Sequence, residues 1–489
     1  MASKVSVWKQ VRGLKPNFWI VNWMEANERL AFFGIRAILP LYMVYAVAEG
    51  GLGLSYGEKG AIYAIWAIVQ CLVPMISGGF TDQYGYKKSL YVAYAINFCG
   101  YIMFAVASGF WSTLAAACMI GLGTAIFKPP VAGTVAKAST EENSSIAWGF
   151  FYWMVNVGGF LAPFLAAILR GETNFQLVFY CAAGVTLFNY IPTIFFYKEP
   201  EQEGEVKIRS VGETIIETLT TLRDKNFIIF LAIFSGFWFM FMQLWDLLPN
   251  FIDEWVFSRD IAPFFAAINE GTVLASGNVK PEMMINIDSF AIIALMLPMA
   301  WLTGKLHPMI ALIGGMVLSV VAFVAAGATN VGLICALAIF IFAIGEMWCS
   351  PKFSEYIGLT APPEKKATYM GYSNIPFAIG WGVGNAISGV LYTHLGSKAN
   401  FAYLHLTKVM GVDPATIPED IALPGLMERL STELNVSVDA ATTVLWHAYD
   451  PWRVWVILGA IGAASTLAMV GYYYKTKHTG ISSTQSNPN

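Results

Sequence analysis

Apolar runs long enough to cross a lipid bilayer recur along the whole chain. A helix needs about 20 mostly apolar residues to span the hydrocarbon core, and twelve such runs can be marked, in two sets of six. The spans are expected at 18–47, 57–81, 88–108, 112–137, 145–169, 174–197, 227–252, 284–304, 308–327, 331–351, 367–395 and 452–474. Only 12% of the residues are charged, against about 25% in soluble proteins. The sequence predicts an all-α, multi-pass membrane protein.

Two sets of six spans are the layout of secondary transporters built from two halves. The expected parts are an N-terminal arm (1–17), an N-terminal six-helix bundle (18–197), a linker with one short amphipathic helix (198–226), a C-terminal six-helix bundle (227–474) containing a long loop (396–450), and a tail (475–489). Segments that face the cytoplasm in this layout hold more than twice as many Lys and Arg residues as the opposite loops, to which Lys59, near the start of the second span, is assigned. The positive-inside rule therefore predicts a cell-membrane protein (inner or plasma membrane) with both termini cytoplasmic.

Two of the loops on the outer side, 253–283 and 396–450, are too long for tight hairpins. The second has Leu and Val at helical spacing and an acidic bias. We expect an elaborated extracytoplasmic loop without a direct role in function. A cap or a surface for a partner is the alternative.

Several classes of function find no support in the sequence. The net charge of −3 gives no reason to expect a nucleic-acid partner. The six cysteines form no CxxC pair, and the five histidines form no HxxH or HExxH spacing, so neither a metal site nor a cofactor is expected. No hydrolase motif is present, and an enzyme is not expected.

Charged residues lie deep in several of the expected spans. One charge at the bilayer centre costs about 2.5–3.5 kcal/mol on insertion scales, so these residues should be paired or face a wet cavity. The first span has Glu25, Glu28, Arg29 and Arg36 close to one helical face. The other deep charges are Lys128 beside two prolines in span four, Asp246 in span seven, Asp288 near the start of span eight, and Glu346 in span ten.

These deep charges are divided between the two halves. The first half has a surplus of cations, and the second half has carboxylates. If a zwitterion bound between the halves, the cations of the first half would contact its carboxylate. The carboxylates of the second half would contact its ammonium group. The pattern predicts a small zwitterionic substrate.

Several segments of the chain resemble sequence motifs of known protein families. The segment GGFTDQYGYKK at 78–88 resembles the GxxxDxxGxxK loop signature of the major facilitator superfamily. Within that superfamily, EANERLAFFG at 25–34 looks like the ExxERFxYYG motif of the proton-coupled oligopeptide transporters (the POT or PTR family). The segments FYWMVNVG at 151–158, Lys128-Pro129, and Gly345-Glu346 followed by Ser350-Pro351 resemble three further motifs of that family.

The resemblance implies a proton-coupled symporter that imports di- and tripeptides or similar zwitterions by alternating access, as a monomeric transport unit with the proton as its coupling ion. It assigns proton coupling to Glu25, Glu28, Arg29 and Lys128. It assigns substrate binding to Arg36 and Lys128 at the carboxylate, Tyr152 and Asn156 at the peptide backbone, and Glu346 and Ser350 at the ammonium group. The loop after span two is expected to form a conformational latch, with Asp82, Lys87 and Lys88.

Two departures from the family pattern fall at the expected peptide site. Phe33 replaces the second tyrosine of the ExxERFxYYG motif, and Cys71 occupies the position in span two that is commonly tyrosine in the family. Two hydroxyl groups of the usual peptide site are therefore missing. A non-peptide anion or metabolite remains an alternative substrate, and a membrane sensor that signals through 396–450 is a further alternative function.

Overall fold

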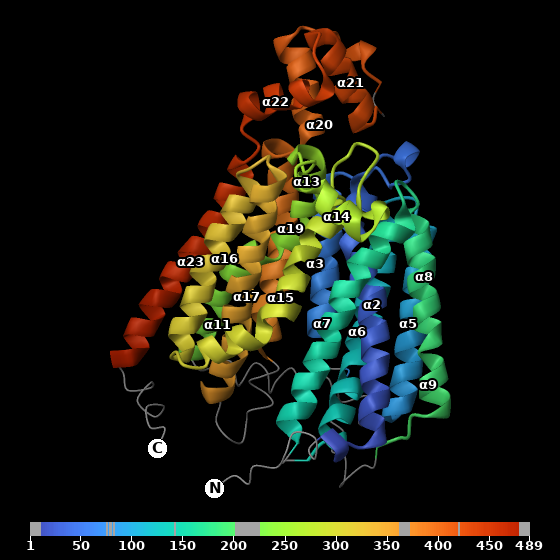
Figure 1. Cartoon of the computed structure of the whole chain (residues 1–489), viewed down its shortest axis with the longest axis vertical. Helices are drawn as coiled ribbons and strands as arrows, with labels where there is room; N and C mark the ends of the chain where they lie inside the picture. Colours follow the sequence, from blue (N-terminus) through green and yellow to red (C-terminus); the bar gives the residue numbers. More distant parts are fainter. Residues whose placement is uncertain are drawn as a thin grey trace. The chain divides into compact units, whose positions relative to one another are not determined.

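The computed structural model describes residues 11–74, 77, 81, 84–140, 143–200, 225–360, 372–418 and 421–478. Helices make up nearly all regular structure in this part of the chain (Figure 1). The helices of the first half are α2 (Pro16–Val44), α3 (Tyr56–Leu72), α5 (Tyr86–Ala105), α6 (Phe110–Ala138), α7 (Ser144–Arg170), α8 (Phe175–Phe188) and α9 (Tyr190–Phe195), with the short η1 (Val47–Glu49).

The second half continues with α11 (Lys225–Phe241), α12 (Gln243–Asp246), α13 (Leu248–Trp255), α14 (Ala262–Ile268), η2 (Glu270–Thr272), α15 (Pro281–Thr303), α16 (Pro308–Gly327), α17 (Gly332–Thr360), α19 (Asn374–Leu395), α20 (Lys398–Leu404), η4 (His405–Val409), η5 (Pro414–Thr416), α21 (Leu423–Leu434), α22 (Val438–Tyr449) and α23 (Arg453–His478). Eight stretches of the described chain are long and apolar enough to cross a membrane. Helices α2, α3, α5 and α15 occupy the other four positions where spans were predicted, so the structure accommodates the twelve-span layout.

The chain divides into two compact units. The N-terminal unit contains Met1–Leu39 and Ile65–Thr221, and the C-terminal unit contains Pro40–Ala64 and Leu222–Asn489. The end of α2 and the first half of α3 therefore group with the second half of the chain, which the sequence-based division at 198–226 does not anticipate. That linker lies almost wholly outside the described residues, as do the first ten residues and the end of the tail.

In the N-terminal unit, α5 packs along both α6 and α8. A buried cluster that includes Phe18, Tyr94, Phe127 and Val131 holds α2, α5 and α6 together. Pro129 and Pro130 lack a backbone N–H group, yet α6 continues through both of them. Helices α8 and α9 are separated at Asn189.

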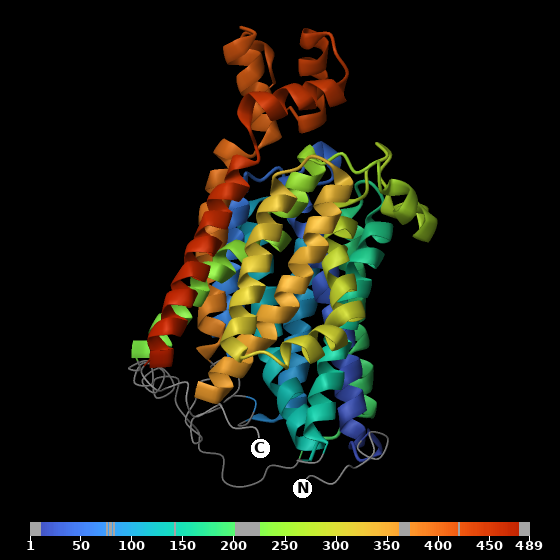
Figure 2. The same ribbon diagram turned by 60° about the vertical axis from the view of Figure 1, so that its left-hand side comes forward.

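In the C-terminal unit, α16 and α17 run side by side, and α23 packs on α11 and α16 (Figure 2). Glycines allow the closest approach, because a Cβ atom at Gly315 would lie 2.6 Å from the carbonyl oxygen of Gly345. Such small residues let helix backbones meet in a membrane. This crossing fixes the backbone next to Glu346.

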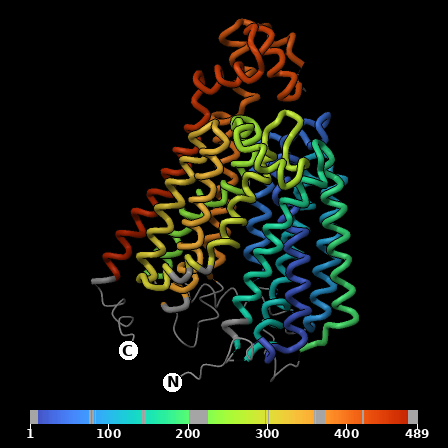
Figure 3. The backbone as a smooth tube through the Cα atoms, in the orientation of Figure 1, coloured from blue at the N-terminus to red at the C-terminus, as the bar shows by residue number. Residues whose placement is uncertain are grey.

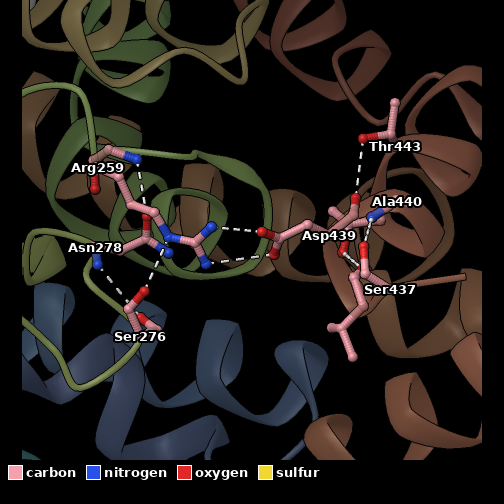
Figure 4. A network of polar contacts seen from close by, with 10 residues as sticks. Arg259, Ser276, Asn278, Ser437, Asp439, Ala440 and Thr443 are labelled. Carbon is pink, nitrogen blue, oxygen red and sulfur yellow. Dashed lines mark hydrogen bonds and ion pairs between the residues drawn. The ribbon is translucent and has the colours of Figure 1, made fainter.

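The long loop at 396–450 folds into helices of its own, α20, α21 and α22, in agreement with the helical spacing of its Leu and Val residues. The other long segment runs from α13 through α14 and η2 to α15, and its course can be followed as the yellow-green part of the tube in Figure 3. A bidentate ion pair joins the two segments: Arg259 Nη1 lies 2.5 Å from Asp439 Oδ2, and Nη2 lies 3.5 Å from Oδ1 (Figure 4). Arg259 Nε also donates to the carbonyl oxygen of Ser276 at 2.9 Å, which fixes the guanidinium plane.

Candidate functional site

A cluster of four charged residues lies inside the N-terminal unit, on α2 and α6. Glu25 is 0% exposed, and its Oε1 atom forms ion pairs with both Arg29, at 3.4 Å from Nε, and Lys128. Glu28 accepts a hydrogen bond from Arg29 Nε at 2.5 Å. The structure therefore brings together all four residues assigned to proton coupling. Their helical spacing explains the three on α2, and α6 supplies the fourth.

Thr124 extends this cluster from the same helix as Lys128. Its hydroxyl donates to Glu28 Oε1 at 3.3 Å. The sequence analysis missed this residue, although Thr124 lies one turn before Lys128 and could have been found by that spacing. The second carboxylate of the cluster is thus held by one cation and one neutral donor.

The aromatic residues after Arg29 cover its guanidinium group. The Arg29 Cζ atom lies 4.7 Å from the Phe32 ring centroid and 5.4 Å from that of Phe33. Helix α7 closes the other side, because a Cβ atom at Gly158 would lie 2.7 Å from the Cβ of Arg29. Phe33 therefore has a packing role here that needs no hydroxyl group.

Lys128 is the cluster residue that remains accessible. Its side chain is 35% exposed, whereas Arg29 and Glu28 are almost fully buried. A cation with one paired side and one open side can receive a second anion when its first partner is neutralised.

Arg36 lies two turns beyond Arg29 on α2 and is 6% exposed. Its guanidinium carbon lies 5.6 Å from the Trp66 ring centroid, and Cys71 on the same helix as Trp66 is within its electrostatic reach. Cys71, at the position that is commonly tyrosine in the family, therefore lies near Arg36, a candidate substrate-binding cation.

Tyr152 and Asn156 lie one turn apart on α7. Tyr152 is 43% exposed, and Asn156 Nδ2 donates to the Tyr152 carbonyl oxygen at 2.8 Å. The Asn156 amide is therefore partly used by its own helix. The phenol of Tyr152 reaches the surface of the unit.

In the C-terminal unit, Glu346 and Ser350 lie one turn apart on α17. The Oε2 atom of Glu346 is buried and receives no hydrogen bond from the part of the chain that the structure describes. Such an acceptor is suited to a ligand that brings its own donors. Ser350 Oγ lies 3.9 Å from the sulfur of Cys349.

A second polar network in this unit surrounds Asp246. Its Oδ2 atom accepts from Trp381 Nε1 at 2.6 Å and from Asn385 Nδ2 at 2.8 Å. Lys59 donates to the Asp246 carbonyl oxygen at 2.7 Å and to Asn250 Oδ1 at 2.6 Å. The sequence analysis counted Lys59 among loop cations, which is wrong, because Lys59 lies within α3 and is 1% exposed.

The latch residues are only partly visible. Asp82 lies outside the described residues, so its expected role remains a prediction. Lys87 is the second residue of α5, where its backbone amide donates to Glu199 Oε2 at 2.9 Å and its Nζ donates to the Ile194 carbonyl oxygen at 3.1 Å. Lys88 is exposed. Glu199, which the sequence analysis did not single out, therefore satisfies free amides at the start of this helix.

Long apolar helices that surround buried, paired charges are typical of a membrane transporter. The family model of the Major Facilitator Superfamily matches residues 28–277, which is just over half of the chain. The chain belongs to the Major Facilitator Superfamily.

Solved structures with this fold include peptide transporters. A POT peptide transporter in complex with sulfate aligns with a TM-score of 0.64 at 19% identity, over 93% of this chain and 95% of that chain. A POT family transporter in complex with 5-aminolevulinic acid aligns with a TM-score of 0.68 at 15% identity, over 94% of this chain and 96% of that one. The resemblance to the POT family that the motifs indicated is confirmed.

The curated relatives divide into two groups. The uncharacterized transporter YclF of Bacillus subtilis is 30% identical over 175 residues, which cover 35% of each chain. A di-/tripeptide transporter of Lactococcus lactis is 29% identical over 180 residues, covering 36% of this chain and 35% of that protein. The multidrug resistance protein MdtH of Klebsiella pneumoniae is 24% identical over 385 residues, covering 78% of this chain and 88% of that protein.

Proposed function

We propose that the protein is a proton-coupled symporter of small zwitterions, with di- and tripeptides as the first candidates. The observation that carries this proposal is the shared oxygen of Glu25, which pairs with Arg29 and Lys128 at once. Breaking one partner away from a buried ion pair typically costs about 3–5 kcal/mol, less where one side is open as at Lys128. A change in the charge of Glu25 would therefore change the ion pairing of Arg29 and Lys128.

Protonation of Glu25 would provide that change. The neutral carboxyl group no longer holds Lys128, and the exposed side of Lys128 is then free for the carboxylate of a substrate. Proton and substrate would bind together, which is the requirement for symport. Arg36 is proposed as a second cation for the same carboxylate, and Tyr152 and Asn156 as groups that bind the substrate backbone.

The ammonium end is assigned to the C-terminal unit. Glu346 has a buried oxygen that receives no hydrogen bond from the described residues, and Ser350 lies on the same side of α17. We propose a monomeric transport unit in a cell membrane, with both termini cytoplasmic, the proton as coupling ion, and no other cofactor. A role for Lys87 and Lys88 in slowing or locking one conformation is part of this proposal.

A second candidate function is transport of non-peptide compounds in multidrug resistance. It is favoured by the match to MdtH, which covers most of both chains, whereas the match to the Lactococcus peptide transporter covers about a third. Phe33 and Cys71, which remove two hydroxyl groups from the expected peptide site, also favour a different cargo.

Binding of two matched probes separates these candidates. Dialanine should bind the purified protein, and N-acetyl-dialanine, which lacks the ammonium group, should bind much more weakly. Glu346→Gln should reduce the affinity for dialanine by about tenfold or more, the loss expected for one charged hydrogen bond, and leave the weak binding of the acetylated probe unchanged. Absence of dialanine binding to the wild type, or an equal loss for both probes, would reject the zwitterion site.

A further inference from the structure

Asp288 on α15 is a buried carboxylate without compensation. It is 0% exposed, and neither of its oxygens receives a hydrogen bond from the described part of the chain. Asp246 is equally buried, but it accepts two hydrogen bonds from Trp381 and Asn385. Burial of an ionised carboxylate without partners is strongly unfavourable. Asp288 therefore needs a ligand or a bound proton to compensate its burial, whereas Asp246 is compensated by its two hydrogen bonds.

Glu346 is the neighbour that Asp288 meets on the adjacent helix. Helices α15 and α17 pack together through a buried cluster that contains Ala291 and Ile292 from one helix and Ala343 and Met347 from the other. Asp288 lies one turn before this pair on α15, and Glu346 lies between the two cluster residues on α17. The two carboxyl groups thus share one helix interface, where they interact electrostatically.

Within the part of the chain that the structure describes, the two other helices with extensive contacts to α15 and α17 bring no compensating cation. Helix α16, which packs on α17, has no charged residue, and α13, which packs on α15, contributes only the acidic Asp253 and Glu254. Both Asp253 and Glu282, on α15 itself, have partners of their own. On α17, Lys352 pairs with Glu355 at 2.6 Å, while the thiol of Cys349 adjoins Glu346.

Two carboxylates in one apolar site cannot both remain ionised at low cost. We infer that Asp288 and Glu346 share one proton and release it when an organic ammonium group binds between them. The release is to water, and both carboxylates are then ionised around the ammonium group. The pair has a net charge of −1 with the shared proton and again −1 with the ammonium group, so the exchange leaves the charge of the apolar site unchanged.

This assignment gives the protein a second proton site, in a different unit from the Glu25 cluster. The ammonium part of it rests on the proposed function, whereas the shared proton does not. It also gives Asp288 a chemical role at the site of Glu346: it supplies the second charge that makes proton release part of amine binding.

Carbodiimide labelling of the full-length protein in detergent tests the shared proton. Dicyclohexylcarbodiimide reacts with protonated carboxyl groups in apolar surroundings, and mass spectrometry locates the adduct. At neutral pH we expect an adduct on Asp288 or Glu346 and none on Asp246. Asp288→Asn should reduce the labelling of Glu346 by about tenfold, the change given by one unit in proton affinity, and Glu355→Gln should leave it unchanged. If Asp288→Asn does not fold, Glu346→Gln offers the same comparison read on Asp288.

Dialanine and N-acetyl-dialanine then test the exchange. Dialanine should reduce labelling of the Asp288–Glu346 pair at least several-fold, because the pair loses its reactive proton when the ammonium group binds. The acetylated probe should not reduce the labelling. No adduct on either residue, or equal labelling of Glu346 in the wild type and Asp288→Asn, would overturn the shared proton. Proton-driven uptake of dialanine without protection would overturn the exchange while leaving the proposed symport intact.

Discussion

Arg29 Nε lies 3.4 Å from the same Glu25 oxygen that also receives Lys128 from a different helix. The two cations approach one buried acceptor, so the loss of its charge affects α2 and α6 together. Arg29 has a second carboxylate partner in Glu28, so under the proposed mechanism it would be retained when Glu25 is neutralised, whereas Lys128 would be released. In the proposed mechanism, this asymmetry would convert protonation of Glu25 into a free cation for the substrate.

Replacement of Glu28 tests the coupling. In Glu28→Gln, Arg29 keeps only its contact with Glu25, which then has to balance both cations and can no longer be neutralised cheaply. We expect gradient-driven accumulation to fall to the level of equilibration, while exchange of labelled for unlabelled substrate continues. Thr124→Val, which removes only the neutral donor at 3.3 Å, is the matched control and should still accumulate substrate. Full accumulation by Glu28→Gln would reject the coupling role.

The beginning of α5 depends on a distant carboxylate. Glu199 accepts hydrogen bonds from the amides of Tyr86, at 2.5 Å, and Lys87, at 2.9 Å. Removing a cap of this kind typically costs about 1 kcal/mol. Glu199→Gln should lower the free energy of unfolding by that amount or less, and Glu199→Ala by more, as measured by thermal unfolding in detergent. Wild-type stability of Glu199→Ala would contradict the capping role.

Glu254 predicts a pH dependence of stability. It lies on α13 next to a cavity of about 850 Å³, and its carboxylate accepts from Tyr56, Tyr392 and the backbone of Lys398. Burial raises its pKa from 4.5 to about 7. A carboxyl group with a raised pKa in the folded state stabilises the fold fully below pH 4.5, and this contribution is lost as the pH rises through 7.

The melting temperature of the wild type should therefore fall between about pH 5 and about pH 8. Glu254→Gln, which keeps an oxygen acceptor for the tyrosines but cannot ionise, should flatten this part of the profile. Glu433→Gln serves as the control, because Glu433 is exposed and pairs with Arg429. This substitution should leave the pH profile unchanged. An identical slope in the wild type and Glu254→Gln would contradict the assignment.

The ion pair between Arg259 and Asp439 should hold the 396–450 segment weakly. Both side chains are close to half exposed, at 48% and 47%, and exposed pairs contribute about 0.2–1 kcal/mol. Arg259→Gln should increase the rate of proteolysis within 396–450 by about two- to fivefold at low salt, and high salt should bring the wild type toward the same rate. Arg429→Gln, which breaks a pair internal to α21, should have no such effect on the attachment.

The sequence predicted the charged face of α2 because helical spacing alone places Glu25, Glu28 and Arg29 together. It could not show that Lys128 meets Glu25 rather than Glu28, because that depends on the register between α2 and α6. Lys59 was misplaced for a related reason: a lysine near the start of a span can face water or, as here, the amide of Asn250. Glu199 lies 113 residues from the Tyr86 amide that it caps, so no local pattern indicated the contact.

Uptake into proteoliposomes under an imposed proton gradient tests the central claim most directly. Purified protein is reconstituted with a neutral interior and an acid exterior, and radiolabelled dialanine is supplied outside. We predict accumulation above the external concentration that collapses when a protonophore dissipates the gradient and that is lost in Glu28→Gln. Uptake that never exceeds equilibration, or accumulation that is unaffected by the protonophore, would contradict proton-coupled symport.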